Sequence, residues 1–179
     1  MSSAIETIKG LSNTYHAYVF GTAFWYTLRG LMRIIDPALV ASWFRPPIQS
    51  HRASTAVVEP NDLEIYNIWT DAWGLLTLAM LLLALADAVP LPKTLAGSSM
   101  VGGAPSQYKK PYARAAVVIT LFHHVTTGIG AYGHWKLESH HTVAMDIGVW
   151  GNVGLVGLGV AALVWGLGEE GESKGAKGE

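Results

Sequence analysis

The chain has 179 residues, half of them apolar and only 14% charged, against roughly 25% in an average soluble domain. A soluble domain of this length leaves much of its surface in water, and so few charges cannot cover that surface. The net charge of -1, without a basic stripe, argues against nucleic-acid binding. The absence of cysteine excludes disulfides, thiolate catalysis and cysteine-ligated zinc.

The first apolar stretch, Tyr15–Ile35, is long enough to cross a bilayer, whose hydrocarbon core takes about 20 mostly apolar residues in a helix. It carries Arg29 and Arg33 near its end, where long side chains can reach the interface. Asp36-Pro37 should end the helix, because the residue before a proline avoids the α region. The apolar run ALVASWF that follows could lie along the interface.

Three further apolar stretches follow in the chain. Ile65–Ala88 has no charge between Asp71 and Asp87, Ala115–Trp135 has only histidines as ionisable residues, and Thr142–Leu167 has a single carboxylate. None shows the polar face of a soluble amphipathic helix. The sequence therefore predicts an all-α polytopic membrane protein with four transmembrane helices in an antiparallel bundle, and disfavours a soluble helical bundle.

Residues 1–168 should form one membrane domain. The connection from Leu91 to Tyr112 is rich in Pro, Gly and Ser, which is typical of a flexible loop. The tail, residues 169–179, is Gly-rich and charged and should be disordered. The distribution of Lys and Arg over the loops weakly favours cytoplasmic termini.

Ionisable residues within a span are costly and default to a functional hypothesis. Counting along the spans places most of them in one half of the bundle. Two carboxylates, an imidazole and an arginine in an apolar pocket can act as an acid–base set. Asp71 or Asp146 would donate a proton, His124 would accept one, and Arg29 would tune the carboxylate. The side chains expected to line the substrate site are Trp69, Trp73, Asn67, Tyr132, His134, Trp150 and Asn152.

Structural alternatives compete with these roles. Asp71 and Arg29 can neutralise each other, and Asp146 can occupy the first turn of its helix, where the helix dipole favours a carboxylate. Of the adjacent pair His123 and His124, at most one should face the pocket.

We predict no metal and no cofactor. The histidines are numerous, but the two His-His pairs lack the spacing that places two ligands on one helix face.

Glycines recur at every third position of the fourth stretch, at Gly148, Gly151, Gly154 and Gly157. Small residues let helices approach closely in a bilayer, so these positions, Gly151 and Gly154 in particular, should be packing positions. The same face could bind another copy of the chain or a partner protein.

The layout of four spans with Trp69, Trp73–Leu78, His123–His124 and a final run ending in Val164-Trp165 resembles the small ergosterol-biosynthesis scaffold proteins of fungi. It also resembles small membrane proteins encoded in fungal specialised-metabolite clusters. The resemblance implies a multi-pass protein of the endoplasmic reticulum that serves lipid or terpenoid biosynthesis.

The leading functional hypothesis is a membrane-embedded isomerase or cyclase acting on a lipophilic isoprenoid- or polyketide-derived substrate. One alternative is a non-catalytic scaffold that tethers membrane biosynthetic enzymes through its glycine faces. Another is a small transporter, which would need polar residues through both halves of the bundle. The expected partners are a lipophilic small molecule, the lipid bilayer and other membrane biosynthetic enzymes.

Overall fold

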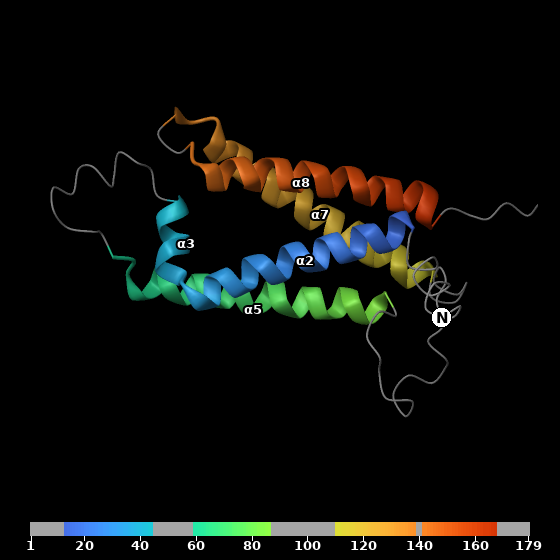
Figure 1. The fold of residues 1–179 in the computed structure, drawn as a ribbon, viewed down its shortest axis with the longest axis horizontal. Coiled ribbons are helices and arrows are strands. Elements are labelled where there is room, and N and C mark those ends of the chain that lie inside the picture. The colour runs from blue at the N-terminus through green and yellow to red at the C-terminus, as the bar shows by residue number, and fades with distance from the viewer. Residues whose placement is uncertain (1–12, 45–58, 87–109, 139–140, 168–179) are drawn as a thin grey trace, which may run out of the picture.

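The computed structural model describes residues 13–44, 59–86, 110–138 and 141–167 (Figure 1). Within these ranges the regular structure is entirely helical, which confirms the predicted all-α class. The helices are α2 (Thr14–Ile35), α3 (Pro37–Phe44), α5 (Asp62–Leu85), α7 (Lys110–Trp135) and α8 (Val143–Ala161), which continues into the π-helical turn η2 (Ala162–Gly166). The predicted loop between Leu91 and Tyr112 lies mostly outside the described residues, as does the tail from 169 to 179.

Side-chain caps determine where the helices begin. The Asn13 side chain accepts the amide hydrogen of His16 at 2.9 Å and starts α2. Asp36 ends α2 and starts α3, because its carboxylate accepts the amide hydrogen of Leu39 at 2.8 Å. Asn61 and Glu64 form a reciprocal capping box that starts α5. This capping box is why α5 begins before the predicted start at Ile65.

The helices pack as two pairs, α2 against α5 and α7 against α8, and α2 also contacts α8 and η2 (Figure 1). The short helix α3 turns across one end of the bundle, where it contacts α2, α5 and α8. The opposite end holds the start of α2 beside the end of η2, where a Cβ on Gly166 would lie 2.7 Å from the Tyr15 backbone nitrogen. The start of α2 and the end of η2 therefore lie at the same end of the bundle.

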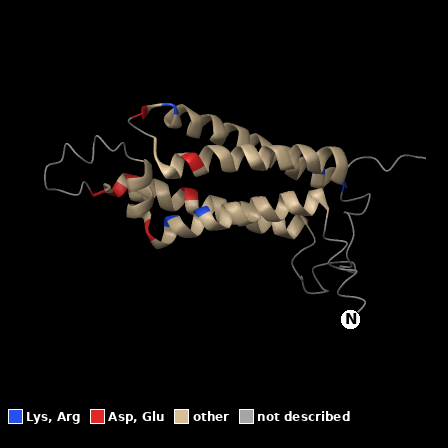
Figure 2. Ribbon diagram, turned by 45° about the horizontal axis from the view of Figure 1, so that its top comes forward, with Lys and Arg blue, Asp and Glu red and all other residues tan. Residues whose placement is uncertain are grey.

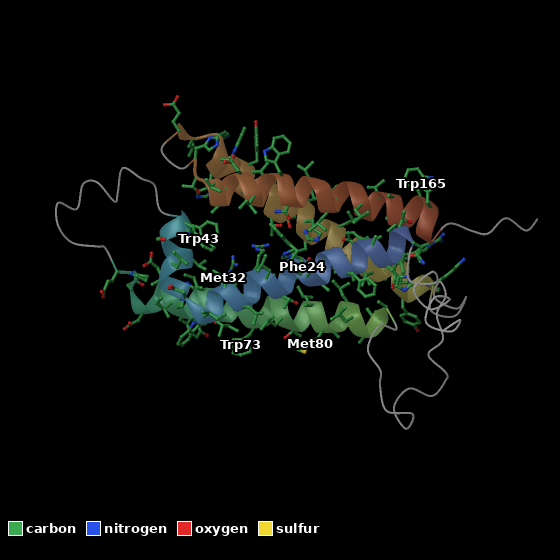
Figure 3. All side chains as sticks on the ribbon, in the orientation of Figure 1. Phe24, Met32, Trp43, Trp73, Met80 and Trp165 are labelled. Atoms are coloured by element: carbon green, nitrogen blue, oxygen red, sulfur yellow. The ribbon has the colours of Figure 1, made fainter. Side chains whose placement is uncertain are left out.

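Three helical segments are long and apolar enough to cross a membrane: Asp62–Leu85, Lys110–Trp135 and Val143–Gly166. They expose large apolar side chains, and Trp73, Met80 and Trp165 point away from the bundle (Figure 3). Such an exterior is suited to lipid. The helix α2 is not among the three, so the predicted four-span count is not established. It contains Arg29 and Arg33 together with several aromatic residues, and it buries side chains against α5, α8 and η2.

The glycines of α8 divide into two groups. A Cβ on Gly151 would lie 2.8 Å from the Trp25 ring, and one on Gly159 would lie 2.7 Å from Leu121, so both positions permit close packing. A Cβ on Gly154 or Gly157 would meet nothing within 4 Å. The prediction that Gly154 is a packing position inside the bundle is therefore wrong. Each step of three residues turns the helix back by about 60°, which carries such a series from the core to the surface.

Candidate functional site

A cavity of about 810 Å³ lies between α2, α3, α7 and α8, at the end of the bundle that carries α3. A volume of this size accommodates a drug-sized molecule. Its lining is mainly apolar and includes no Asp or Glu among the described residues. The lining residues are Trp25, Arg29, Arg33, Val40, Ser42, Trp43, Phe44, Thr127, Gly130, Ala131, His134, Thr142, Val143, Ala144, Met145, Ile147, Gly148 and Asn152.

A buried hydrogen-bond network forms the inner wall of this cavity. Asn152 is 3% exposed, and its side-chain oxygen lies 3.0 Å from His124 Nδ1 and accepts the Thr127 hydroxyl at 3.1 Å. Its amide nitrogen donates to the Gly148 carbonyl at 2.7 Å. The other His124 nitrogen lies 3.3 Å from the Thr22 hydroxyl. Each polar group therefore has a partner, as a buried position requires, and the network ties α2, α7 and α8 together.

His124 is fully buried and does not line the cavity. The sequence placed it in an acid–base role, but both of its ring nitrogens are engaged within the network. At most one histidine of the His123–His124 pair was expected to face the pocket, and neither lines the cavity; His123 is half-buried. The ring of Tyr26 stacks on His124 at 5.3 Å and meets His123 edge-on at 5.1 Å. Tyr26 thus fills the space between α2 and α7.

Arg29 and Arg33 extend from α2 into the cavity lining. Arg33 Nε lies 2.8 Å from an Asp71 carboxylate oxygen. The neutralising partner of Asp71 is therefore Arg33, and the alternative that named Arg29 is corrected. The Asp71 side chain is 52% exposed and does not line the cavity. Arg29 instead lies over the Trp25 ring at 5.9 Å, and its Nη1 is buried without a hydrogen-bond partner in the described part of the chain.

Asp146 lies in the first turn of α8, which matches the structural alternative considered for it. Its carboxylate accepts the indole hydrogen of Trp135 at 2.6 Å and lies 3.0 Å from His141 Nε2. These contacts keep Asp146 outside the cavity lining. The two carboxylates of the expected acid–base set are thus both held elsewhere, and of the four predicted catalytic residues only Arg29 lines the cavity.

The predicted substrate-binding residues separate in the same way. His134 and Asn152 line the cavity. The other five are exposed on the outer surface of the helices, because their helices turn these positions away from the interior: Asn67, Trp69, Trp73, Tyr132 and Trp150. In the described residues, no group of three or more potential metal-ligating side chains comes together, and His140 lies outside them.

Several cavity residues were not anticipated from the sequence. Trp25 and Tyr26 resemble interfacial aromatics in the sequence, yet Tyr26 is fully buried and Trp25 lines the cavity. Trp43 and Val40 come from α3, the apolar run after Asp36-Pro37. An apolar run directly after the helix-ending Asp36-Pro37 pair was the signal in the sequence that the chain folds back over the bundle.

Charged residues of the described helices gather mainly in the half of the bundle that carries α3, with a few more at the opposite end (Figure 2). Between these two groups the helices carry no Lys, Arg, Asp or Glu over residues 15–28, 72–85, 115–135 and 147–166. At the opposite end, Arg114 donates two hydrogen bonds to the Leu167 carbonyl, at 2.8 and 3.2 Å. The cavity therefore lies in the more charged half, although its own lining is mainly apolar.

An all-helical bundle with three helices able to cross a membrane, and a cavity at one end, is compatible with a multi-pass α-helical membrane protein. The chain belongs to the family described as a domain of unknown function, DUF8792, whose profile matches residues 18–177. No curated protein and no solved structure matches the chain.

Proposed function

We propose that this protein is a multi-pass membrane protein that binds a lipophilic small molecule in the cavity between α2, α3, α7 and α8, as part of lipid or specialised-metabolite biosynthesis. The observation that carries the proposal is the cavity itself, about 810 Å³ in volume and mainly apolar. Apolar pockets with a few polar groups are typical of sites for small lipophilic ligands. In this proposal α2 is the fourth span, and the endoplasmic reticulum remains the expected location.

The geometry favours binding over proton transfer by the predicted acids. A general acid must lie within hydrogen-bond reach of its substrate, and neither Asp71 nor Asp146 lines the cavity. An isomerase or cyclase reaction here would therefore rely on the polar groups that do line it, Arg29, His134 and Asn152 among them. Product formation by purified protein remains the test of that chemistry.

Two glycines on α7 provide a matched test of the binding site. Gly130 lines the cavity, Gly133 does not, and a Cβ on either would meet nothing within 4 Å. We expect Gly130→Leu to fill the cavity without disturbing the fold, and Gly133→Leu to leave the cavity open. Lipophilic compounds extracted from the purified full chain would be measured by mass spectrometry per mole of protein. Equal amounts in wild type and both variants would refute the binding site.

A second candidate, the non-catalytic scaffold, is favoured by the open positions Gly154 and Gly157 on the outer face of α8. Small residues on such a face permit close approach of another transmembrane helix. Gly154→Leu should then reduce self-association or enzyme tethering in reconstituted membranes, measured by cross-linking, while leaving cavity binding intact. Unchanged cross-linking would assign this face to lipid.

A further inference from the structure

The cavity lining contains a half-buried cation, Arg29, for which no ion pair is found among the described residues. Arg29 and Arg33 lie one turn apart on α2, and both line the cavity. Arg33 has its carboxylate partner at 2.8 Å. Arg29 contacts the face of Trp25, which supplies neither a negative charge nor a lone pair, and its Nη1 is buried without a partner. An uncompensated buried charge is unfavourable, so this position is suited to an anion from outside the chain.

Three carboxylates near this end of the bundle have partners other than Arg29. Asp36 caps α3, Glu64 belongs to the capping box of α5, and Asp146 binds Trp135 and His141. The two segments that connect helices at this end, residues 45–58 and 139–140, contain no Asp or Glu in their sequence. Among the described residues no carboxylate lines the cavity, and Asp71, the carboxylate that acts on the Arg29 charge, pairs directly with Arg33.

Other hydrogen-bonding groups beside Arg29 also lack partners among the described residues. The indole nitrogen of Trp25 is buried and unpaired, and so is the hydroxyl of Tyr26, which is fully buried. Both residues are within one turn of Arg29 on α2. The guanidinium and indole nitrogens can only donate hydrogen bonds. A ligand that satisfies them must supply acceptor oxygens.

We propose that the cavity binds a lipophilic carboxylic acid as its anion, with the carboxylate at Arg29 and the apolar body against the surrounding helices. The inference rests on the proposed binding function and specifies its ligand class. A planar guanidinium matches a carboxylate with two parallel hydrogen bonds, and the Trp25 indole adds a further donor. A phospholipid phosphate shares the negative charge, but a two-chain lipid exceeds the drug-sized molecules that cavities of this volume accommodate.

The test compares two ligands with the same eighteen-carbon type of apolar chain, one charged and one neutral. Tritiated oleate and tritiated oleyl alcohol would be titrated onto the full chain in a nonionic detergent. Arg29→Gln removes the charge, Arg29→Lys retains it, and Lys136→Gln removes an exposed cation that does not line the cavity. Gly130→Leu reports whether either ligand occupies the cavity.

We expect the wild type to bind oleate about 10- to 100-fold more tightly than oleyl alcohol, as a charge-assisted hydrogen bond implies. Arg29→Gln should abolish that preference, whereas Arg29→Lys should keep most of it and Lys136→Gln all of it. Equal affinities for oleate and oleyl alcohol in the wild type would overturn the assignment of the anion, as would an unchanged preference in Arg29→Gln. If Arg29→Gln does not fold, the comparison of oleate with oleyl alcohol in the wild type decides the assignment.

Two further outcomes separate this inference from the proposed function. If Gly130→Leu binds both ligands as tightly as the wild type, the cavity is not the binding site, and the proposed function is refuted together with this inference. If both ligands need the open cavity but bind equally well, only the carboxylate assignment fails. Displacement of oleate by phosphatidylglycerol, without displacement by phosphatidylcholine, would overturn the free acid in favour of a bilayer lipid.

Discussion

The ion pair between Arg33 and Asp71 offers a direct test of whether Asp71 has a structural role. The two side chains meet at 2.8 Å, with Arg33 10% and Asp71 52% exposed. Asp71→Asn removes the negative charge with almost no change in shape. Arg33 then keeps the hydrogen bond from its Nη1 to the Arg29 carbonyl at 3.0 Å, and the asparagine oxygen can still accept from its Nε, but the buried cation loses its counter-ion.

The expected loss of stability lies between two reference cases. Exposed ion pairs contribute about 0 to 1 kcal/mol, whereas removal of one partner from a buried pair costs about 3 to 5 kcal/mol. Since only the Arg33 side of this pair is buried, we expect Asp71→Asn to cost about 1 to 3 kcal/mol. Adding Arg33→Gln should recover most of the loss, because the unpaired cation is then gone. The coupling between the two substitutions should be about 1 kcal/mol or more.

Reversible unfolding in detergent would measure the four members of this double-mutant cycle, with Glu138→Gln as the control for an exposed carboxylate in the turn after α7. The structural role would be refuted by an Asp71→Asn variant as stable as the wild type, or by additive losses in the double variant. A variant that is stable but forms no product in the intact pathway would instead support Asp71 as a proton donor.

Further outcomes test the packing, the network and the tail. Gly151→Ala should cost about 1 to 3 kcal/mol from overpacking against Trp25, while Gly154→Ala should be neutral or stabilising by up to about 1 kcal/mol; equal melting temperatures for the two would contradict this packing. His124→Leu should cost about 1 to 3 kcal/mol, because it leaves buried partners unsatisfied, and an unchanged unfolding free energy would show that the network adds no stability. Removal of Glu169–Glu179 should leave folding and ligand binding intact, and a loss of either at normal expression would identify the tail as functional.

Local features of the sequence were sufficient to predict the four long helices, but not the short helix α3. Long apolar stretches predict helices because a chain in lipid must satisfy its backbone hydrogen bonds within each segment. The helix ends were predicted less well. The helix α5 begins at a cap formed by the Asn61 side chain, and a sequence with several polar residues before an apolar stretch does not show which of them is the cap. The all-α class depended on neither detail.

The composition of the site could not be predicted in the same way, because it depends on how the helices are rotated and which pairs meet. Counting along the chain gave the depth of Asp71, Asp146 and Arg29, and the charges do gather mainly in one half of the bundle (Figure 2). The depth of a residue along a span does not show which way its side chain faces. For this reason the two carboxylates were assigned to a common pocket that they do not line.

The sequence by itself determined the helical class, the extents of the apolar segments and the end of the bundle at which the charges concentrate, because each of these follows from local composition and the helical rise. Only the tertiary structure decided that Asp71 pairs with Arg33, that His124 is enclosed by hydrogen-bond partners, and that Arg29 faces a cavity. These outcomes depend on rotations of a few tens of degrees about each helix axis and on the return of α3 across the bundle. Such rotations are chosen by side-chain packing between segments far apart in the chain, and no local pattern encodes them.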